Sequence, residues 1–291
     1  MTFDVAVIGA PFLDLTFEGL SDLPRQGDEI VATALHVAPG GTGTQAAALA
    51  RLRMRVVIVA PVGSDFASKA LRQMLQEEGV VVSGADRGGA NVTTLLCTPS
   101  GVAMATALGA AEPTHDEVVS IDARAVIASL GRLHLVGTSA SVYAVTGGLE
   151  LPRVDDAMLD RLAGTRAVIM NAAEATALMK TPDADTAARH LAGLGTTAIV
   201  TQGVEGAVAV KQDAATRAEA PGLDVKHATG AGDLFTAAYV WADLRGASLE
   251  DGLRWATLYA SLSLRGPTAF HGALRLEQVL EVGVARGLTP P

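Results

Sequence analysis

The sequence predicts an α/β protein, a three-layer α/β/α sandwich with a mostly parallel central sheet and a small second β-sheet. Short apolar runs typical of buried strands recur along the 291 residues, and most precede helical patterns of about 10 to 15 residues. The composition agrees with this architecture, because 49% of the residues are hydrophobic, only 4% are aromatic and 31 are Gly. Helices therefore pack on the sheet through small and aliphatic side chains.

The alternation of strands and helices runs along most of the chain. Five apolar runs are predicted as strands: Val5–Ile8, Val56–Ala60, Leu133–Val136, Ala167–Met170 and Ala198–Thr201. Six patterns are predicted as helices: Ser64–Glu78, Asp155–Ala163, Asp183–Leu194, Ala231–Leu244, Leu249–Leu264 and Leu276–Ala285. Several of these helices begin with Ser or Asp and end near Gly, as capped helices do. The order predicts a parallel sheet covered by helices on both faces.

Two segments, residues 11–38 and 91–110, interrupt this alternation. They hold the short strand-like runs Ile30–Thr33, Val92–Cys97 and Val102–Leu108, and the turn residues Pro99-Ser100-Gly101 predict a hairpin. We expect both segments to form a small β-sheet lid on a single domain that spans residues 1–291. An apolar face on a lid strand would be exposed in a monomer, which favours a homodimer through the lid.

Charge and cysteine content argue against several classes of protein. Lys and Arg total 22 against 31 Asp and Glu, a formal net charge of −9, so a nucleic-acid partner is not expected. No run approaches the roughly 18 apolar residues of a membrane span, and the first residues lack the basic region of a signal peptide. The single Cys97 is expected to be a buried thiol, which favours a cytoplasmic location.

The most informative motif is Thr229-Gly230-Ala231-Gly232-Asp233, which opens an apolar helical run. Glycines let the backbone approach a ligand closely, and the free N–H groups at a helix start favour an anion. Asp233 has two interpretations. It is either an ordinary N-cap or a general base that accepts the proton of a hydroxyl attacking a phosphoryl group held by the glycine amides.

Three further motifs each have an ordinary structural interpretation as well. Residues Pro39–Gln45 form a Gly-rich turn before the helical run Ala46–Leu52. Asn171 and Glu174 follow a predicted strand, at the sheet edge where ligands of open α/β sheets bind, and their spacing also matches a capping box. Residues Thr201–Gly206 form a tight turn after the next strand.

These motifs, in this order and over nearly the whole chain, resemble the ribokinase family of carbohydrate kinases, also called the PfkB family. The resemblance implies a transferase that moves the γ-phosphoryl group of ATP, with Mg²⁺, to a hydroxyl of a small sugar beneath the lid. It also implies a role for each motif residue. These are Asp233 as catalytic base, with Gly230, Ala231 and Gly232 as anion hole; Asp14, Gly40, Gly41 and Gln45 on the substrate; Thr201, Gly203, Gly206 and Asn171 on the nucleotide; and Glu174 on Mg²⁺ through water.

The sequence departs from the family pattern at three places. Gln45 stands where the family usually has Asn, so its amide is carried on a longer side chain. His227 stands where the family often has an Asp that helps to hold K⁺, so we expect weak or absent activation by K⁺. Residues 137–171 hold one clear helix, and we expect the sheet to be one strand narrower there.

Other functions are weighed against this interpretation. The chain lacks the Gly-x-x-x-x-Gly-Lys-Ser/Thr pattern of P-loop enzymes, and Gly9-Ala10-Pro11 lacks the glycine spacing of a dinucleotide-binding turn. The histidines lack the spacing of a zinc site. A nucleoside kinase on the same fold stays open as an alternative, as does a sensor without catalysis that binds sugar or nucleotide. The few basic residues in the lid segments argue against a sugar phosphate as acceptor.

Overall fold

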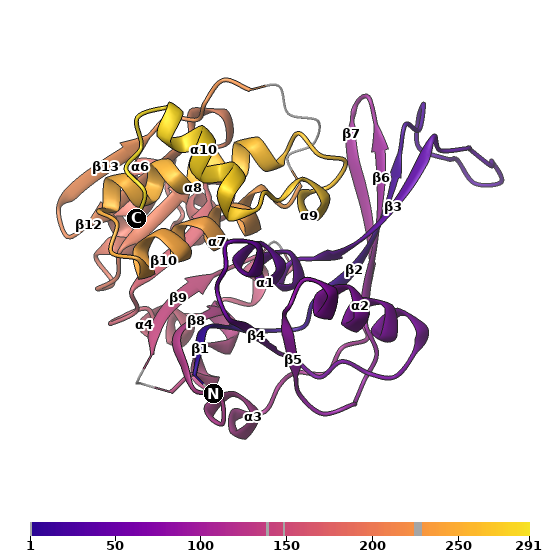
Figure 1. Cartoon of the computed structure of the whole chain (residues 1–291), viewed down its shortest axis with the longest axis horizontal. Helices are drawn as coiled ribbons and strands as arrows, with labels where there is room; N and C mark the ends of the chain where they lie inside the picture. The colour runs from indigo at the N-terminus through magenta and orange to yellow at the C-terminus, as the bar shows by residue number, and fades with distance from the viewer. Residues whose placement is uncertain (1, 138–139, 148, 224–228) are drawn as a thin grey trace.

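The main layer of the molecule is a nine-stranded sheet in the order β13-β12-β11-β10-β9-β8-β1-β4-β5 (Figure 1). The computed structural model describes residues 2–137, 140–147, 149–223 and 229–291. Its strands are β1 (Phe3–Ile8), β4 (Val56–Val59), β5 (Val81–Ser83), β8 (Ala123–Ser129), β9 (Ser141–Val145), β10 (Ala167–Asn171), β11 (Ala198–Thr201), β12 (Ala207–Lys211) and β13 (Ala214–Ala218). Only the pairs β11–β12 and β12–β13 are antiparallel, so the predicted mostly parallel sheet is confirmed.

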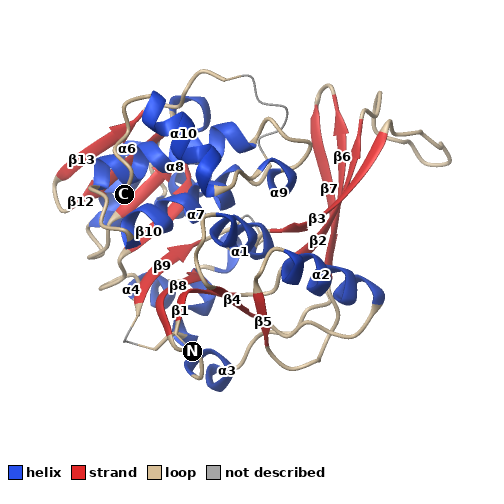
Figure 2. Ribbon diagram, in the orientation of Figure 1, coloured by secondary structure: helices blue, strands red, loops and turns tan. Residues whose placement is uncertain are grey.

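Helices cover both faces of this sheet, and this confirms the three-layer sandwich (Figure 2). One face carries α1 (Thr42–Arg51), α2 (Phe66–Glu77), α7 (Ala231–Leu244), α8 (Leu249–Ser263) and α10 (Leu276–Ala285). The other carries α3 (His115–Val119), α4 (Asp156–Asp160), α5 (Ala172–Met179), α6 (Ala184–Ala192) and the 3₁₀ helix η1 (Leu130–Leu135). Strand β1 shows why both layers of helices are needed. Its residues Val5 and Val7 pack into the core on one face of the sheet, and Ala6 and Ile8 pack into the core on the other face. No helix in the described part of the chain is long and apolar enough to cross a membrane.

A separate four-stranded sheet, in the order β3-β2-β6-β7, projects to one side of the main body (Figure 1). Its strands are β2 (Phe12–Glu18), β3 (Ala34–Gly40), β6 (Asn91–Thr98) and β7 (Gly101–Ala107). They come from the two segments that interrupt the strand and helix alternation, and β3 runs two residues past the first of them. Strands β6 and β7 pair antiparallel with Thr98 opposite Gly101, so the predicted hairpin is confirmed.

Two predicted strands are wrong. The run Leu133–Val136 falls mainly in η1, because a short apolar run is buried equally well in a helical turn, and its pattern alone does not separate the two. The run Ile30–Thr33 is irregular, with Val31 84% exposed, and the residues after it form β3 instead. Since β3 is an edge strand, it tolerates Pro39, which lacks the N–H that a central strand must donate.

The expectation of a narrower sheet is also wrong. Strand β9 lies between β8 and β10 and pairs parallel with both, so the stretch at residues 137–171 supplies its own strand. This strand has five residues, Ser141–Val145. Helix α4 follows it and is shorter than the predicted helix Asp155–Ala163.

Candidate active site

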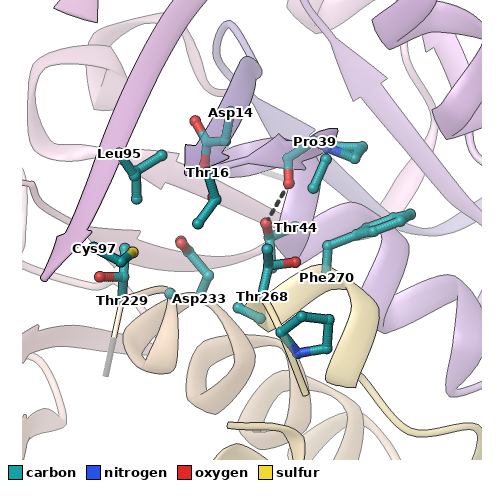
Figure 3. Close-up of a pocket in the computed structure, with 15 residues that line it drawn as sticks. Asp14, Thr16, Pro39, Thr44, Leu95, Cys97, Thr229, Asp233, Thr268 and Phe270 are labelled. Carbon is teal, nitrogen blue, oxygen red and sulfur yellow. Dashed lines mark hydrogen bonds between the residues drawn. The ribbon is translucent and has the colours of Figure 1, made fainter. Parts of the chain in front are cut away.

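A cavity of about 110 Å³ lies between the small sheet, the start of α7 and the short helix α9 (Ala269–Gly272) (Figure 3). Its lining residues come from segments far apart in the sequence: Asp14, Thr16, Ala38, Pro39, Gly41, Thr44, Leu95, Cys97, Thr229, Gly230, Asp233, Pro267, Thr268, Ala269 and Phe270. Two carboxylates face it, and none of the described residues that line it is Lys or Arg. The cavity is therefore suited to a small ligand rich in hydroxyl groups and without negative charge.

The start of α7 leaves backbone N–H groups unpaired beside this cavity. Gly230 is the N-cap in the left-handed conformation, at φ 84°, and a Cβ there would lie 2.5 Å from the Cβ of Ala269. The first helical bond runs from the N–H of Leu234 to the carbonyl of Gly230, so the three preceding N–H groups have no partner within the helix. Nothing lies within 4 Å of a Cβ built on Gly232. An anion can thus approach the helix start closely.

Asp233 lies in the first turn of α7 and points into the cavity (Figure 3). It is not the N-cap, because Gly230 holds that position. The pKa of Asp233 is raised to about 7, chiefly by burial and further by the negative charges of Asp14 and Glu174, while the hydrogen bond from Gln45 acts to lower it. A carboxyl group that titrates near neutral pH is suited to exchange a proton with a ligand.

Asp14 faces the same cavity from β2, where it pairs with Ala38 of β3 (Figure 3). A Cβ on Gly40 would lie 2.0 Å from Oδ2 of Asp14, so only glycine leaves room for this carboxylate. Burial raises the pKa of Asp14 to about 6. Gly41 is the N-cap of α1 at φ 54°, a conformation that favours glycine.

The predicted substrate residues are therefore brought together in different ways. Asp14 and Gly41 line the cavity, and Gly40 lies behind Asp14. Gln45 is not among the lining residues, and its Nε2 donates to Oδ1 of Asp233 at 2.8 Å.

Helix α9 closes the cavity on the side of the main body, and Arg51 holds it in place. Nη1 of Arg51 donates to the carbonyls of Phe270, at 2.5 Å, and Ala273, at 2.8 Å. The guanidinium carbon lies 4.7 Å from the centre of the Phe270 ring. These contacts fix the aromatic wall of the site.

Sequence reasoning missed part of the cavity lining, including Thr16, Leu95, Cys97 and Phe270. Two of these could have been found from the period of two residues in strands. Thr16 lies two residues after Asp14 on β2, and Leu95 pairs with Thr16 across β6. Phe270 has no such signal, because it comes from a distant helix.

The predicted nucleotide residues lie at the carboxyl ends of two neighbouring strands, outside the cavity. Asn171 ends β10 and pairs in parallel register with Thr201 at the end of β11. Asn171 and Glu174 form the capping box of α5, with N–H to side-chain oxygen distances of 2.9 and 3.1 Å. Burial raises the pKa of Glu174. Both residues thus have the capping role that their spacing indicates, at an edge that is also suited to a ligand.

The turn after β11 needs both of its glycines. Gly203 has φ 61° and Gly206 has φ 95°, which favour glycine. A Cβ on Gly206 would lie 2.0 Å from the carbonyl oxygen of Ala218. The N–H of Gln202 donates to the carbonyl of Gly206 at 2.7 Å and closes the turn. Val204, at its tip, is 88% exposed.

Other candidate groups do not add to the site. Cys97 is buried, so the expected buried thiol is confirmed, and burial together with the charge of Glu18 raises the pKa of that thiol. Among the described residues, no group of three or more His, Cys, Asp or Glu is arranged to hold a metal ion. His227 lies outside the described residues, and the expectation about K⁺ stays a prediction.

Comparison with known proteins agrees with this geometry. Residues 3–271 match the pfkB family carbohydrate kinase. The chain is 28% identical over 285 residues to a ribokinase of Bacillus subtilis, covering 90% of this chain and 92% of that protein. The structure of Arabidopsis thaliana ribokinase complexed with ribose and ATP matches with a TM-score of 0.82, 23% identity and coverage of 97% of this chain and 99% of that chain. A nucleoside kinase of Methanocaldococcus jannaschii matches with a TM-score of 0.76, 17% identity and coverage of 96% and 97%.

The chain therefore belongs to the pfkB family of carbohydrate kinases, which are phosphotransferases that act on a hydroxyl group. Its fold is the ribokinase fold of these solved structures.

Proposed function

We propose that this kinase transfers the γ-phosphoryl group of ATP to a hydroxyl group of a small neutral sugar. The placement of Asp233 carries the proposal. This carboxylate lies in the first turn of α7, shares the cavity with Asp14, and has a pKa raised to about 7. It is suited to accept the proton of a hydroxyl group as that hydroxyl attacks the phosphorus atom.

The acceptor sugar would lie in the cavity between the two sheets. The carboxylate of Asp14 would accept hydrogen bonds from sugar hydroxyls, Gly40 leaves room for that carboxylate, and Gly41 lets the sugar approach the backbone. Gln45, which the resemblance assigns to the substrate, lies outside the cavity lining and contacts Asp233 instead. Asp14 and the backbone at Gly41 would orient the attacking hydroxyl toward Asp233.

The amides at the start of α7 would stabilise charge on the transferring phosphoryl group. Gly230, Ala231 and Gly232 place unpaired N–H groups and the positive end of the helix dipole beside Asp233. Preorganised N–H donors of this kind act most strongly where charge develops during the reaction. They form the anion hole of the proposed mechanism.

The nucleotide would bind along the carboxyl ends of β10 and β11, at Asn171, Thr201, Gly203 and Gly206. The positive-φ turn at Gly203 and Gly206 leaves the exposed apolar side chain of Val204 free to contact a base. Glu174 lies near enough for its charge to raise the pKa of Asp233, which supports adjacent nucleotide and acceptor sites. The relative solved with ribose and ATP supports the binding of both a sugar and a nucleotide.

Mg²⁺ fits the donor set at this edge. Mg²⁺ in phosphoryl-transfer sites keeps several waters and binds one or two carboxylates together with phosphate oxygens, so it needs no dedicated cluster of side chains. Glu174, whose side chain is half-buried, would hold the ion through water. When bound, Mg²⁺ would offset negative charge on the phosphates.

A nucleoside acceptor is the second candidate, favoured by the match to a solved nucleoside kinase. The cavity favours the sugar, because its volume of about 110 Å³ is below the roughly 300–1,000 Å³ of pockets for larger ligands. Assays with ribose, fructose, 2-keto-3-deoxygluconate and adenosine separate the two. Phosphorylation of adenosine alone would overturn the sugar assignment, and no ATP consumption with any acceptor would favour the sensor.

Replacement of the base tests the mechanism. We expect Asp233→Asn to lower kcat at least about 1,000-fold, since general-base and electrostatic contributions are lost together, while ATP affinity measured by calorimetry stays within about twofold. Asp156→Asn is the matched control, because Asp156 lies in the first turn of the exposed helix α4. Substantial turnover by Asp233→Asn would overturn the assignment.

We further propose that the small sheet is a lid over the acceptor, since β2 and β6 supply one wall of the cavity. Closure would exclude water, which competes as a phosphoryl acceptor. The small sheet exposes the large apolar side chains of Leu35 on β3 and Met104 on β7, so a homodimer through the lid stays our expectation. A single species of monomer mass at micromolar concentration would refute it. A cytoplasmic location likewise stays an expectation, which fractionation of cells would test.

A further inference from the structure

Gln45 makes a contact that the proposed function does not require. It lies on α1 with 5% of its surface exposed, and its Nε2 donates to Oδ1 of Asp233 at 2.8 Å. The two residues are 188 positions apart in the sequence, and packing of α1 on α7 brings them together. If Gln45 served only to bind the sugar, its amide would point toward the acceptor and not toward Asp233.

We infer that Gln45 is a positioning residue for the base, holding one oxygen of Asp233 so that the other accepts the proton. This inference rests on the proposed role of Asp233. An ionised carboxylate only accepts hydrogen bonds, whereas the amide nitrogen of Gln45 only donates, so the pair has one good arrangement while Asp233 is charged. The bond limits rotation of the carboxylate and makes Oδ1 the less basic oxygen.

Oδ2 is then the atom that takes part in the reaction. As the acceptor oxygen forms its bond to phosphorus, its proton moves to Oδ2, and the bond between phosphorus and the ADP oxygen breaks with its electrons leaving on ADP. The proton on Oδ2 passes to water after the products leave. Gln45 neither gains nor loses a proton in this sequence.

The surroundings of Asp233 make this hydrogen bond matter. The carboxylates of Asp14, from β2, and Glu174, from α5, both disfavour the charged form of Asp233, and burial acts in the same direction. The bond from Gln45 opposes all three effects. None of the described residues that line the cavity is cationic, so a neutral donor does the work that a cation does in many other sites.

The second end of the amide has no partner of its own. Oε1 of Gln45 is buried and has no partner among the described residues. When Asp233 is protonated, the amide can turn over so that Oε1 accepts a hydrogen bond from the carboxyl group. When Asp233 is ionised, the amide is held with its N–H groups toward the carboxylate.

The test replaces the amide by an apolar side chain of similar length. Gln45→Met removes the donor and leaves the burial of Asp233 unchanged. The matched control is Gln73→Met, because Nε2 of Gln73 also donates to a carboxylate, Oε1 of Glu77, at 2.9 Å, on the exposed face of α2. Carbon-13 NMR of labelled aspartate carboxyl groups follows the titration without any substrate, and Asp233→Asn identifies the signal.

We expect the titration of Asp233 to move to higher pH by roughly one to two units in Gln45→Met, the size expected for the loss of a hydrogen bond to a charged group. With the acceptor found in the sugar panel, the acid limb of kcat/KM moves by the same amount. Activity at pH 7 then falls roughly 5- to 50-fold, and at pH 9 it recovers to about half of its maximum or more. Gln73→Met changes neither the titration nor the pH profile.

Each outcome separates this inference from the proposed function. If Asp233→Asn keeps its activity, the proposed base is wrong, and the NMR titration still reports whether Gln45 acts on its pKa. If Asp233→Asn is inactive but Gln45→Met titrates as the wild type does, or loses activity equally at every pH, Gln45 has only a structural role. If Gln45→Met does not fold, Gln45→Leu also removes the donor without adding a charge and must shift the titration in the same direction.

Discussion

The two sheets of this kinase differ in how they are covered. In the main sheet every residue of β4 is buried, and helices pack on both faces. In the small sheet β6 alternates between buried and half-buried residues, and β7 is largely exposed. The main sheet buries far more apolar area per residue, which is the chief source of stability.

This difference divides the work of the molecule. The main body holds the start of α7 and the strand ends at fixed places, and the small sheet turns one face, with Asp14 and Thr16, toward the cavity. Changes in the body should therefore act on the free energy of unfolding. Changes on the inner face of the small sheet should act on acceptor binding and on the pH profile.

The largest effect is expected in the body. Trp255 is fully buried, donates from its indole N–H to the carbonyl of Thr289, and packs edge to face with Trp241. We expect Trp255→Ala to lower the free energy of unfolding by about 3–5 kcal/mol. Met104→Ala, at a residue of the small sheet that is 63% exposed, should stay within about 0.5 kcal/mol. Urea denaturation measures the free energy of unfolding of both variants. Equal losses in the two variants would contradict the idea that the main body supplies most of the stability.

The second effect is at the junction of the two regions. In Gly40→Ala the new methyl group would lie 2.0 Å from Oδ2 of Asp14 and force that carboxylate to move. We expect kcat/KM for the acceptor to fall roughly 100-fold, as displacements of about 1 Å do in active sites, while ATP affinity is kept. Gly222→Ala, where nothing lies within 4 Å, is the control. Unchanged acceptor kinetics would show that Asp14 does not hold the sugar.

The smallest effect is a shift in pH dependence. The pKa of Asp14 is raised to about 6, so the carboxyl group is charged above that pH. As the pH falls through about 6, Asp14 loses its charge and binds sugar hydroxyls more weakly. Its charge also raises the pKa of Asp233. We expect Asp14→Asn to move the acid limb of kcat to lower pH, opposite to Gln45→Met, with kcat/KM about tenfold lower. If the acid limb of the kcat profile does not move in Asp14→Asn, the carboxylates of Asp14 and Asp233 do not interact.

The elements predicted most accurately from the sequence have strong local signals. Helices α7 and α10 begin and end where the apolar pattern and the caps predict. The run Leu133–Val136 and strand β9 were misjudged because a short apolar segment is buried in either conformation, and only its neighbours decide.

By itself, the sequence determined the local features of the site. Glycines at 41, 203, 206 and 230 adopt positive φ values that other residues rarely adopt, and this preference belongs to each residue alone. Family membership follows from the same motifs. Only the tertiary structure decided that Asp14 packs against Gly40 and that the amide of Gln45 reaches Asp233. Such contacts depend on how α1, α7 and the small sheet pack together, and neither residue of a pair carries that information in its local sequence.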